Sequence, residues 1–196
     1  MHSIEPYFNW RNLYTAEEDF RSPFHGRAYS EVYFTDAIYD HLIHPQWDNI
    51  GSSTLFVKIL FAEYEDGYAI IELLGEWNDT LYNDVMTLKR EVIDILIDEG
   101  INKFVLIGDN VLSFHSSDDS YYEEWFDDIE DGWVVMLNFR QHILDDFKQV
   151  AIDNYFISGG PLNDFAWGSF RPMQLFQKIA QIVERRFDVG YLIEEQ

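Results

Sequence analysis

The chain contains no cysteine. This absence excludes disulfide bonds, thiolate nucleophiles and zinc sites built on thiolates. No apolar run reaches the length that a helix needs to cross a bilayer, and the first residues lack the basic stretch and apolar core of a signal peptide. We therefore expect a cytoplasmic protein that does not bind membranes.

Positive charge is scarce. The chain has 13 Lys and Arg against 36 Asp and Glu, a formal net charge of -23. The excess is spread evenly, because residues 1–98 contribute -12 and residues 99–196 contribute -11. A field of this sign repels phosphate backbones and anionic lipids, which argues against nucleic-acid binding, and it attracts basic proteins. The simplest interpretation of the charge is a soluble, self-repelling surface.

Recognised catalytic and cofactor motifs are also absent. The sequence contains no Gly-x-x-x-x-Gly-Lys-Ser/Thr, no Gly-x-Gly-x-x-Gly and no Gly-x-Ser-x-Gly. His41 and His44, beside Asp40, have a spacing that zinc ligands use, but zinc would need further ligands from elsewhere. The acidic segment 118–131 lacks the central glycine of a calcium-binding loop. We therefore predict no cofactor and no metal, and a non-enzymatic protein is favoured.

Aromatic residues are plentiful, with 16 Phe, 12 Tyr and 6 Trp. With 47% hydrophobic residues, they can supply a folded core. Residues 1–53 consist of short aromatic and polar pieces, with a strand expected over 28–34 and a helix over 36–44 that Pro45 ends. We predict that this segment is an arm packed on an α/β domain of residues 54–196. A homo-oligomer formed through the aromatic arm is a further expectation.

The sequence from residue 54 onward alternates between strand and helix patterns. Asp66-Gly67, the dipeptide preferred in type I′ turns, is expected to join the first two strands as a hairpin. Helical periodicity and end signals mark the later helices. The predicted strands span 55–64, 68–77, 103–108 and 133–139, and the predicted helices span 80–99, 118–131, 141–156 and 172–187. This order predicts a β-hairpin followed by a mixed, mostly parallel sheet with helices on its faces.

The order of elements over residues 54–187 resembles the STAS-like fold of anti-sigma-factor antagonists and related bacterial regulators. The resemblance is one of topology, and it implies a regulatory or protein-interaction module without catalytic activity. In that family a phosphorylatable serine begins the helix after a central strand. Serines follow residues 104–107 here, but none has the family's Asp-Ser-Ser/Thr-Gly context, so no phosphorylation site is assigned. These serines are Ser113, Ser116, Ser117 and Ser120.

Polar residues are expected at the carboxyl ends of the later strands, where open parallel sheets usually bind ligands. If these strands are mutually parallel, their polar ends share one rim. The candidate ligand-binding residues are Asp79, Asp109, Asn110, His115, Asn138 and Arg140. The competing interpretation is that these residues cap helices and turns or form local ion pairs. The alternative function is that of a small-molecule-binding protein or small enzyme that uses these polar residues.

The segment 118–131 contains eight carboxylates interleaved with aromatic residues. On a helix, Tyr122, Trp125, Phe126 and Ile129 would form one apolar face anchored to the sheet. The carboxylates would then lie on the solvated faces. A sharper hypothesis is a docking face for a basic protein partner, because complementary charge steers association and specificity. Its candidate residues are Glu123, Glu124, Asp127 and Asp128.

Overall fold

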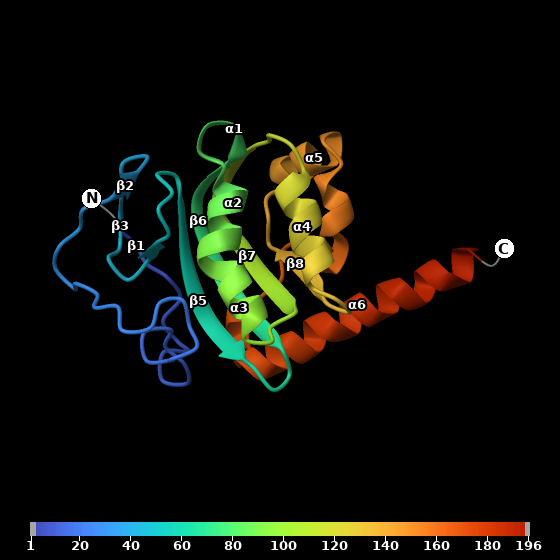
Figure 1. Cartoon of the computed structure of the whole chain (residues 1–196), viewed down its shortest axis with the longest axis horizontal. Coiled ribbons are helices and arrows are strands. Elements are labelled where there is room, and N and C mark those ends of the chain that lie inside the picture. Colours follow the sequence, from blue (N-terminus) through green and yellow to red (C-terminus); the bar gives the residue numbers. More distant parts are fainter. Residues whose placement is uncertain (1–2, 195–196) are drawn as a thin grey trace.

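The computed structural model describes the backbone of residues 3–194 and the side chains of residues 3–187. A five-stranded sheet of order β4-β5-β6-β7-β8 forms its centre (Figure 1). Its strands are β4 (Asp48–Asn49), β5 (Leu55–Glu63), β6 (Tyr68–Asn78), β7 (Lys103–His115) and β8 (Trp133–Leu137). The pairs β4–β5 and β5–β6 are antiparallel, whereas β6, β7 and β8 are mutually parallel. The α/β class is confirmed, but the prediction of a mostly parallel sheet was wrong.

The hairpin between β5 and β6 forms where the sequence predicts it, with a different turn. Glu63 pairs with Tyr68, so four residues connect the strands instead of two. A type I′ turn needs positive φ at both central residues. Asp66 does not adopt positive φ, whereas Gly67 does, at +67°. The prediction of a type I′ turn at Asp66-Gly67 was therefore wrong.

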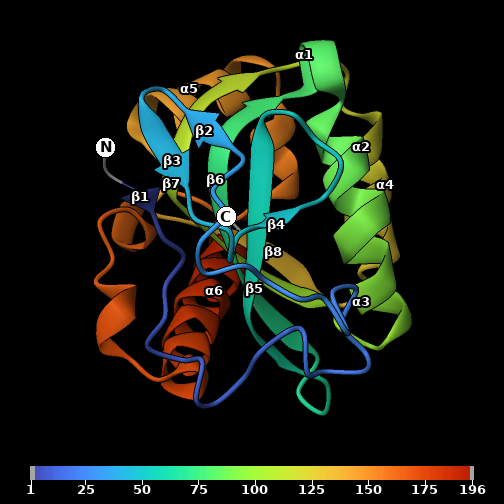
Figure 2. The same ribbon diagram turned by 90° about the vertical axis from the view of Figure 1, so that its left-hand side faces the viewer.

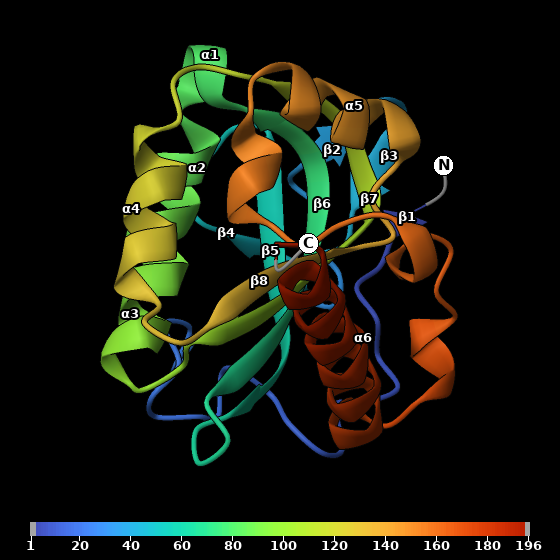
Figure 3. The same ribbon diagram turned by 90° about the vertical axis from the view of Figure 1, so that its right-hand side faces the viewer.

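Helices cover one face of the sheet (Figure 3). They are α1 (Asp79–Tyr82), α2 (Asp84–Leu88), the π-helical turn η1 (Lys89–Ile93), α3 (Asp94–Asp98), α4 (Ser120–Asp128) and α5 (Gln141–Gln149). The predicted helix over 80–99 is interrupted at Asn83, whose φ of 51° is left-handed. Asn78 caps the start as expected, because its Oδ1 accepts a hydrogen bond from the Leu81 N–H at 3.0 Å. The helices bury the largest apolar cluster of the protein against the sheet.

The opposite face is covered by the N-terminal arm and by α6 (Pro172–Glu194) (Figure 2). In the arm, β1 (Ser3–Ile4), β3 (His41–Ile43) and β2 (Ala37–Ile38) form a small sheet. The helix predicted over 36–44 is therefore wrong, and so is the strand over 28–34, which has no regular structure. Tyr39 and Asp40, with φ of 40° and 41°, form the turn that replaces the helix.

Short 3-10 helices connect the later elements. After α5 come η2 (Ile152–Tyr155), η3 (Gly160–Leu162) and η4 (Trp167–Ser169), and α6 then runs beneath the sheet and away from it toward the C-terminus (Figure 1). Two anchors hold the arm from outside the sheet. Arg21 pairs with Glu99 at 2.7 Å, and the Asp19 carboxylate accepts the hydroxyls of Tyr14 and Tyr64. Between residues 3 and 194, no helix has both the length and the apolar character needed to cross a membrane.

Candidate functional site

The central strand β7 continues to His115, beyond the end at Gly108 that the sequence predicts. The polar pair Asp109-Asn110 therefore lies inside the sheet and not at the rim. Glu72 pairs with Ile107 and Leu74 pairs with Asn110, so β7 contains one residue more than β6 over this interval. Such a β-bulge re-aims side chains, and bulges are common beside functional sites. A Cβ at Gly108 would overlap the ring of Phe139, so glycine is required at the bulge.

Glu72, on β6, is buried beside this bulge and is 4% exposed. Its Oε2 accepts a hydrogen bond from the Tyr7 backbone N–H at 2.9 Å, and its Oε1 accepts one from the Asn110 amide at 3.2 Å. Burial, together with the charge of Asp109, raises the pKa of Glu72 to about 7, although the two hydrogen bonds oppose the shift. A carboxyl group that titrates near neutral pH is suited to proton transfer.

Asp109 connects the bulge to the segment that precedes α6. Its Oδ1 accepts a hydrogen bond from the Asn138 amide at 3.1 Å, and its Oδ2 accepts one from the Trp167 indole N–H at 2.7 Å. Asn138 also binds the backbone of Phe165 in both directions, at 2.6 and 3.0 Å. Two residues of the predicted rim, Asp109 and Asn138, are therefore in direct contact.

Three aromatic residues of distant segments pack together over this part of the sheet. The rings of Tyr7, Trp10 and Trp167 meet edge to face, with centroids 4.6–5.7 Å apart. The Tyr7 hydroxyl donates to the Gly168 carbonyl at 2.6 Å, and the Trp10 indole donates to the Phe170 carbonyl at 3.0 Å. These contacts hold the arm closed over Glu72.

The other predicted ligand-binding residues lie elsewhere. Asp79 is 3% exposed, and it accepts hydrogen bonds from the Val85 N–H at 2.8 Å and from the Tyr122 hydroxyl. Burial raises its pKa to about 6. His115 is exposed and lines a surface hollow with Asp146, whereas Arg140 is exposed at the N-cap of α5. Asp79 accepts a backbone hydrogen bond near the start of α2, as the local interpretation expects. Arg140 makes neither the local ion pair nor a side-chain cap bond among the residues whose side chains are described.

Glu72 was not among the sequence-predicted candidates. A signal was present, because a single carboxylate interrupts the apolar run Ala69-Ile-Ile-Glu-Leu-Leu74 on a strand that has neighbours on both sides. Charged side chains are almost never fully buried without a partner. A lone acid in the apolar run of a central strand therefore indicates a buried carboxyl group that has polar partners.

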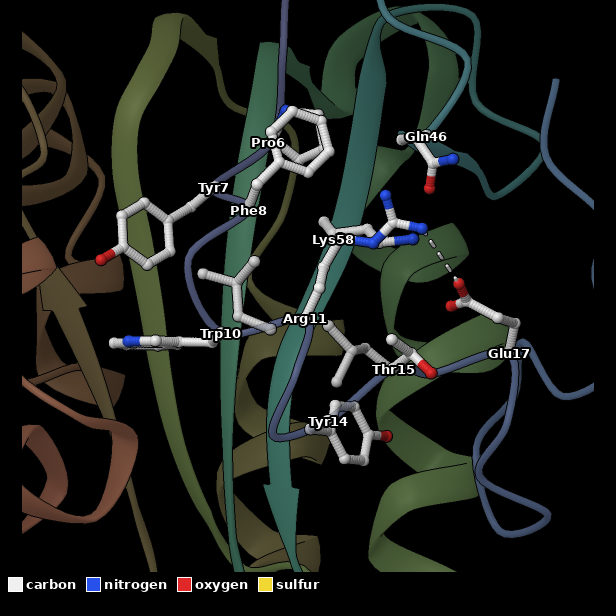
Figure 4. A pocket seen from close by; sticks show the side chains of 12 residues that line it. Pro6, Tyr7, Phe8, Trp10, Arg11, Tyr14, Thr15, Glu17, Gln46 and Lys58 are labelled. Carbon is white, nitrogen blue, oxygen red and sulfur yellow. Dashed lines mark ion pairs between the residues drawn. The ribbon is translucent and has the colours of Figure 1, made fainter. Parts of the chain in front are cut away.

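A small cavity with both apolar and polar lining lies between the arm and β5 (Figure 4). Its volume is about 20 Å³, and its lining includes Arg11, Thr15, Glu17, Gln46 and Lys58. The Lys58 ammonium, on a side chain 9% exposed, forms an ion pair of 3.3 Å with Asp48, which is completely buried. Tyr7 and Trp10 line the same cavity and cover Glu72, so the two polar features are adjacent.

The acidic helix α4 has its apolar face as predicted, with one exception. Tyr122, Trp125 and Ile129 are buried, whereas Phe126 is 51% exposed. The prediction that Phe126 anchors the helix to the sheet was therefore wrong. Its ring instead lies 6.0 Å from that of Tyr155, on the outside of the protein.

Two of the four predicted docking acids, Glu124 and Asp128, form ion pairs with a lysine of the same chain. Lys89 has a completely buried side chain, and its ammonium lies 3.1 Å from Glu124 and 2.6 Å from Asp128. It also pairs with Asp94 at 2.6 Å, and Arg90 pairs with Glu124 at 2.7 Å. These ion pairs join α4 to the preceding helical segment.

The remaining acids, Glu123 and Asp127, flank the exposed Phe126 along the chain, and the Tyr155 ring beside Phe126 is partly buried against the core. The Tyr155 hydroxyl donates to Asp119 Oδ2 at 3.1 Å. Partial burial, this hydrogen bond and the charges of Asp119, Glu123 and Asp127 all raise the pKa of Tyr155. We name Asp119, Glu123, Phe126, Asp127 and Tyr155 the α4 surface.

The part of the chain with described side chains contains no group of three or more histidine and carboxylate side chains placed to hold a metal ion. His41 lies on β3, and His44 directly follows that strand. The His44 ring packs edge to face against Phe8 and Phe34. Comparison with protein-family models gives no match, and comparison with curated proteins finds no similar sequence.

Proposed function

We propose that the protein is a non-catalytic interaction module that binds a basic protein partner through the α4 surface. The observation that carries this proposal is the exposed ring of Phe126 beside Glu123 and Asp127, two carboxylates that form no ion pair within the part of the chain whose side chains are described. An aromatic anchor within a polar rim is the usual composition of a binding hot spot. The STAS-like order of elements supports a regulatory role for such contacts.

The chemistry of the α4 surface selects Lys and Arg side chains on the partner. A cation over the Phe126 or Tyr155 ring gains about 0.5–1 kcal/mol at an exposed site, and the neighbouring carboxylates add steering and specificity. Glu124 and Asp128 contribute less, because breaking their ion pairs with Lys89 would offset the gain. The proposal therefore narrows the four predicted acids to Glu123 and Asp127 and adds the aromatic pair.

A charge-reversed α4 surface tests the proposal. In the variant Glu123→Lys/Phe126→Ala/Asp127→Lys, we expect binding of a synthetic amphipathic peptide rich in Lys and Arg to weaken about tenfold or more, since hot-spot truncations cost more than about 1.4 kcal/mol. Isothermal titration calorimetry measures the affinity. Amide chemical shifts of the wild-type protein should locate the peptide on α4.

A matched control changes the same charge at another place. Glu18 and Glu65 are exposed acids, and Phe20 is 80% exposed. The variant Glu18→Lys/Phe20→Ala/Glu65→Lys has the same net charge as the test variant and loses one exposed aromatic ring. Because the two variants have equal net charge, the control should lose only the part of the affinity that depends on net charge. It should therefore bind the peptide more tightly than the test variant. Equal weakening in both variants would show that net charge alone governs binding and would remove the proposal.

A second candidate function is small-molecule binding or catalysis at the β7 bulge. The near-neutral pKa of Glu72, beside Asp109 and Asn110, favours it. Titration with a panel of small polar metabolites should then shift the amide signals of Asp109, Asn110 and Trp167. The variant Glu72→Gln should abolish those shifts. A panel that shifts only the signals of the α4 surface would argue against this candidate.

A further inference from the structure

An apolar hollow on the surface of the protein is flanked by two arginines. It has a volume of about 350 Å³ and lies between η3 and the middle of α6. The described residues that line it are Pro161, Ile182, Arg185 and Arg186. The three residues of α6 stand three and four positions apart, so they share one face of the helix. Only 13 Lys and Arg occur in the whole chain, and two of them lie at this one hollow.

Neither arginine forms an ion pair with a carboxylate whose side chain is described between residues 3 and 187. Arg186 is held by neutral groups, because its guanidinium donates to the carbonyls of Ser158 at 2.7 Å and Gly159 at 2.5 Å. Arg185 is exposed, and the neighbouring Glu184 lines a different hollow along α6. Two positive charges beside an apolar surface favour a ligand that combines carboxylates with an apolar group.

The chain itself presents such a group on α4. The Phe126 ring is 51% exposed, and the exposed acids Glu123 and Asp127 lie close to it in the sequence. An aromatic ring flanked by acids thus complements an apolar hollow flanked by arginines, both in charge and in polarity. Figures 2 and 3 show α4 at one side of the molecule, apart from α6. Contact between the two surfaces therefore requires two copies of the chain.

The net charge of -23 opposes self-association at long range. At physiological ionic strength, however, the interaction between exposed charges is screened over about 8 Å. The opposite charges that meet at the contact would lie closer together than this distance, whereas most of the like charges of the two copies lie farther apart. Local complementarity can therefore outweigh the overall repulsion.

We propose that the hollow binds the α4 surface of a second copy of this chain. Phe126 of one copy enters the hollow of the next, where Glu123 and Asp127 lie beside Arg185 and Arg186. This inference rests on the proposed function, because it assigns the basic surface that meets α4 to the chain itself. Two different surfaces form the contact, so the association is head-to-tail and produces a ring or an open chain of molecules.

Mixing two variants tests the proposal. Arg185→Glu changes the hollow and keeps the α4 surface, whereas Glu123→Lys/Phe126→Ala/Asp127→Lys changes the α4 surface and keeps the hollow. We expect each variant alone to self-associate about tenfold or more weakly than the wild type. An equimolar mixture should form a complex that stops at 1:1, because one intact α4 surface meets one intact hollow. Sedimentation velocity measures these masses.

Two results of this experiment would overturn the proposal. One is a wild-type protein that stays monomeric up to millimolar concentration. The other is a mixture of the two variants that stays monomeric where the wild type associates, which would place the contact on another surface, such as the aromatic arm.

Lys178→Glu is the matched control for the hollow. Lys178 is exposed on the same helix and is not among the residues that line the hollow, and its replacement changes the net charge by the same amount as Arg185→Glu. The control should self-associate more tightly than Arg185→Glu. Equal weakening by the two changes would show that net charge alone governs the association, and the proposal would then be wrong.

The basic peptide separates this inference from the proposed function. Arg185→Glu retains the α4 surface, so it should bind the peptide at least as tightly as Lys178→Glu does. If the peptide binds α4 while the wild-type chain stays monomeric, the inference fails and the proposed function stands. If the variants associate as expected while the peptide does not bind α4, the inference stands and binding of a separate basic protein is removed.

Discussion

The two faces of the five-stranded sheet are covered by different kinds of structure. On one face, helices α2 to α5 bury a largely apolar cluster, and most of their acids point outward or pair at the helix surfaces, whereas Asp84 is buried. On the other face, the arm covers Glu72, the Asp48–Lys58 pair and the small cavity. The difference has a physical cause. A helix satisfies its own backbone, whereas an irregular segment needs buried side chains to accept its N–H groups.

Glu72 illustrates this cause directly, because its carboxylate accepts the backbone N–H of Tyr7. The helical face has comparable features in Lys89, Asp79 and Asp84. Lys89 joins two helices, and Asp84 accepts hydrogen bonds from Ser52, Thr54 and the Asn78 N–H. The comparison teaches that polar burial in this protein occurs where one segment is attached to another. The arm face should therefore respond more strongly to loss of charge or change of pH than the helical face.

Removal of the Asp48 carboxylate should have the largest effect. Asp48 is 0% exposed and accepts hydrogen bonds from Tyr29 at 2.5 Å, Arg27 at 3.0 Å and Lys58 at 3.3 Å. Asp48→Asn leaves Lys58 buried without an anion, and we expect the free energy of unfolding to fall by about 3–5 kcal/mol. Urea denaturation measures the change. The double variant Asp48→Asn/Lys58→Met should recover part of it, and no recovery would show that the ion pair is not the cause.

Stability should also depend on pH through Glu72. Its pKa rises from 4.5 to about 7 on folding, so the folded state holds a proton that the unfolded state has lost between these values. The contribution is present below about pH 4.5 and disappears as the pH rises through 7, at a cost of up to about 3 kcal/mol. Glu72→Gln should remove this contribution and leave the smaller one from Asp79, whose pKa is raised to about 6, so the slope of stability against pH should become shallower.

Denaturant titrations between pH 4.5 and 8 measure this effect. Glu65→Gln, at an exposed position of the hairpin turn, is the control and should keep the wild-type slope. Parallel stability curves for wild type and Glu72→Gln would mean that Glu72 remains ionised in the folded protein. That result would also remove the second candidate function.

On the helical face, loss of Lys89 should cost less than loss of Asp48. Lys89→Met removes the cation from Asp128, whereas Asp94 and Glu124 keep their ion pairs with Arg90. The three carboxylate side chains are 27–43% exposed, so water can also solvate them. We expect the free energy of unfolding to fall by about 2 kcal/mol, below the 3–5 kcal/mol of a fully buried pair. Thermal or urea unfolding measures it. A loss larger than that of Asp48→Asn would reverse the comparison of the two faces.

The smallest effect on stability is expected at Phe126. Because its ring is half exposed, Phe126→Ala should change the free energy of unfolding by no more than about 0.5 kcal/mol. The neighbouring Trp125 is 1% exposed, and Trp125→Ala should cost about 3–5 kcal/mol. Calorimetry on both variants measures the two losses of unfolding free energy. A large loss at Phe126 would mean that the ring is structural and would weaken its assignment to a binding surface.

Much of the helical face could be predicted from sequence. The apolar runs of β5, β6 and β8 and the spacing of Tyr122, Trp125 and Ile129 depend on neighbours along the chain, and these predictions were confirmed. The exposure of Phe126 could not be predicted in this way. It lies at one side of the apolar face, and only the position of α4 beside η2 leaves its ring outside.

The candidate site was predicted less well, because its groups come from distant segments. Asp109 and Asn110 resemble the end of a strand in sequence, yet β7 continues through them. The polar pair stays in the sheet because Glu72, Asn138 and Trp167 supply its hydrogen bonds. These partners lie 29–58 residues apart along the chain, so no local sequence pattern can show that they meet.

The sequence by itself determined the acidic surface, the α/β class, the hairpin and the helix that carries the carboxylates. Each of these follows from composition or from a repeat over a few residues. Only the tertiary structure decided that Glu72 is buried, that the arm encloses a small cavity, and that two of the four docking acids pair with Lys89. The reason is that burial and ion pairing depend on what covers a residue, and here the covering segments lie far away in the chain.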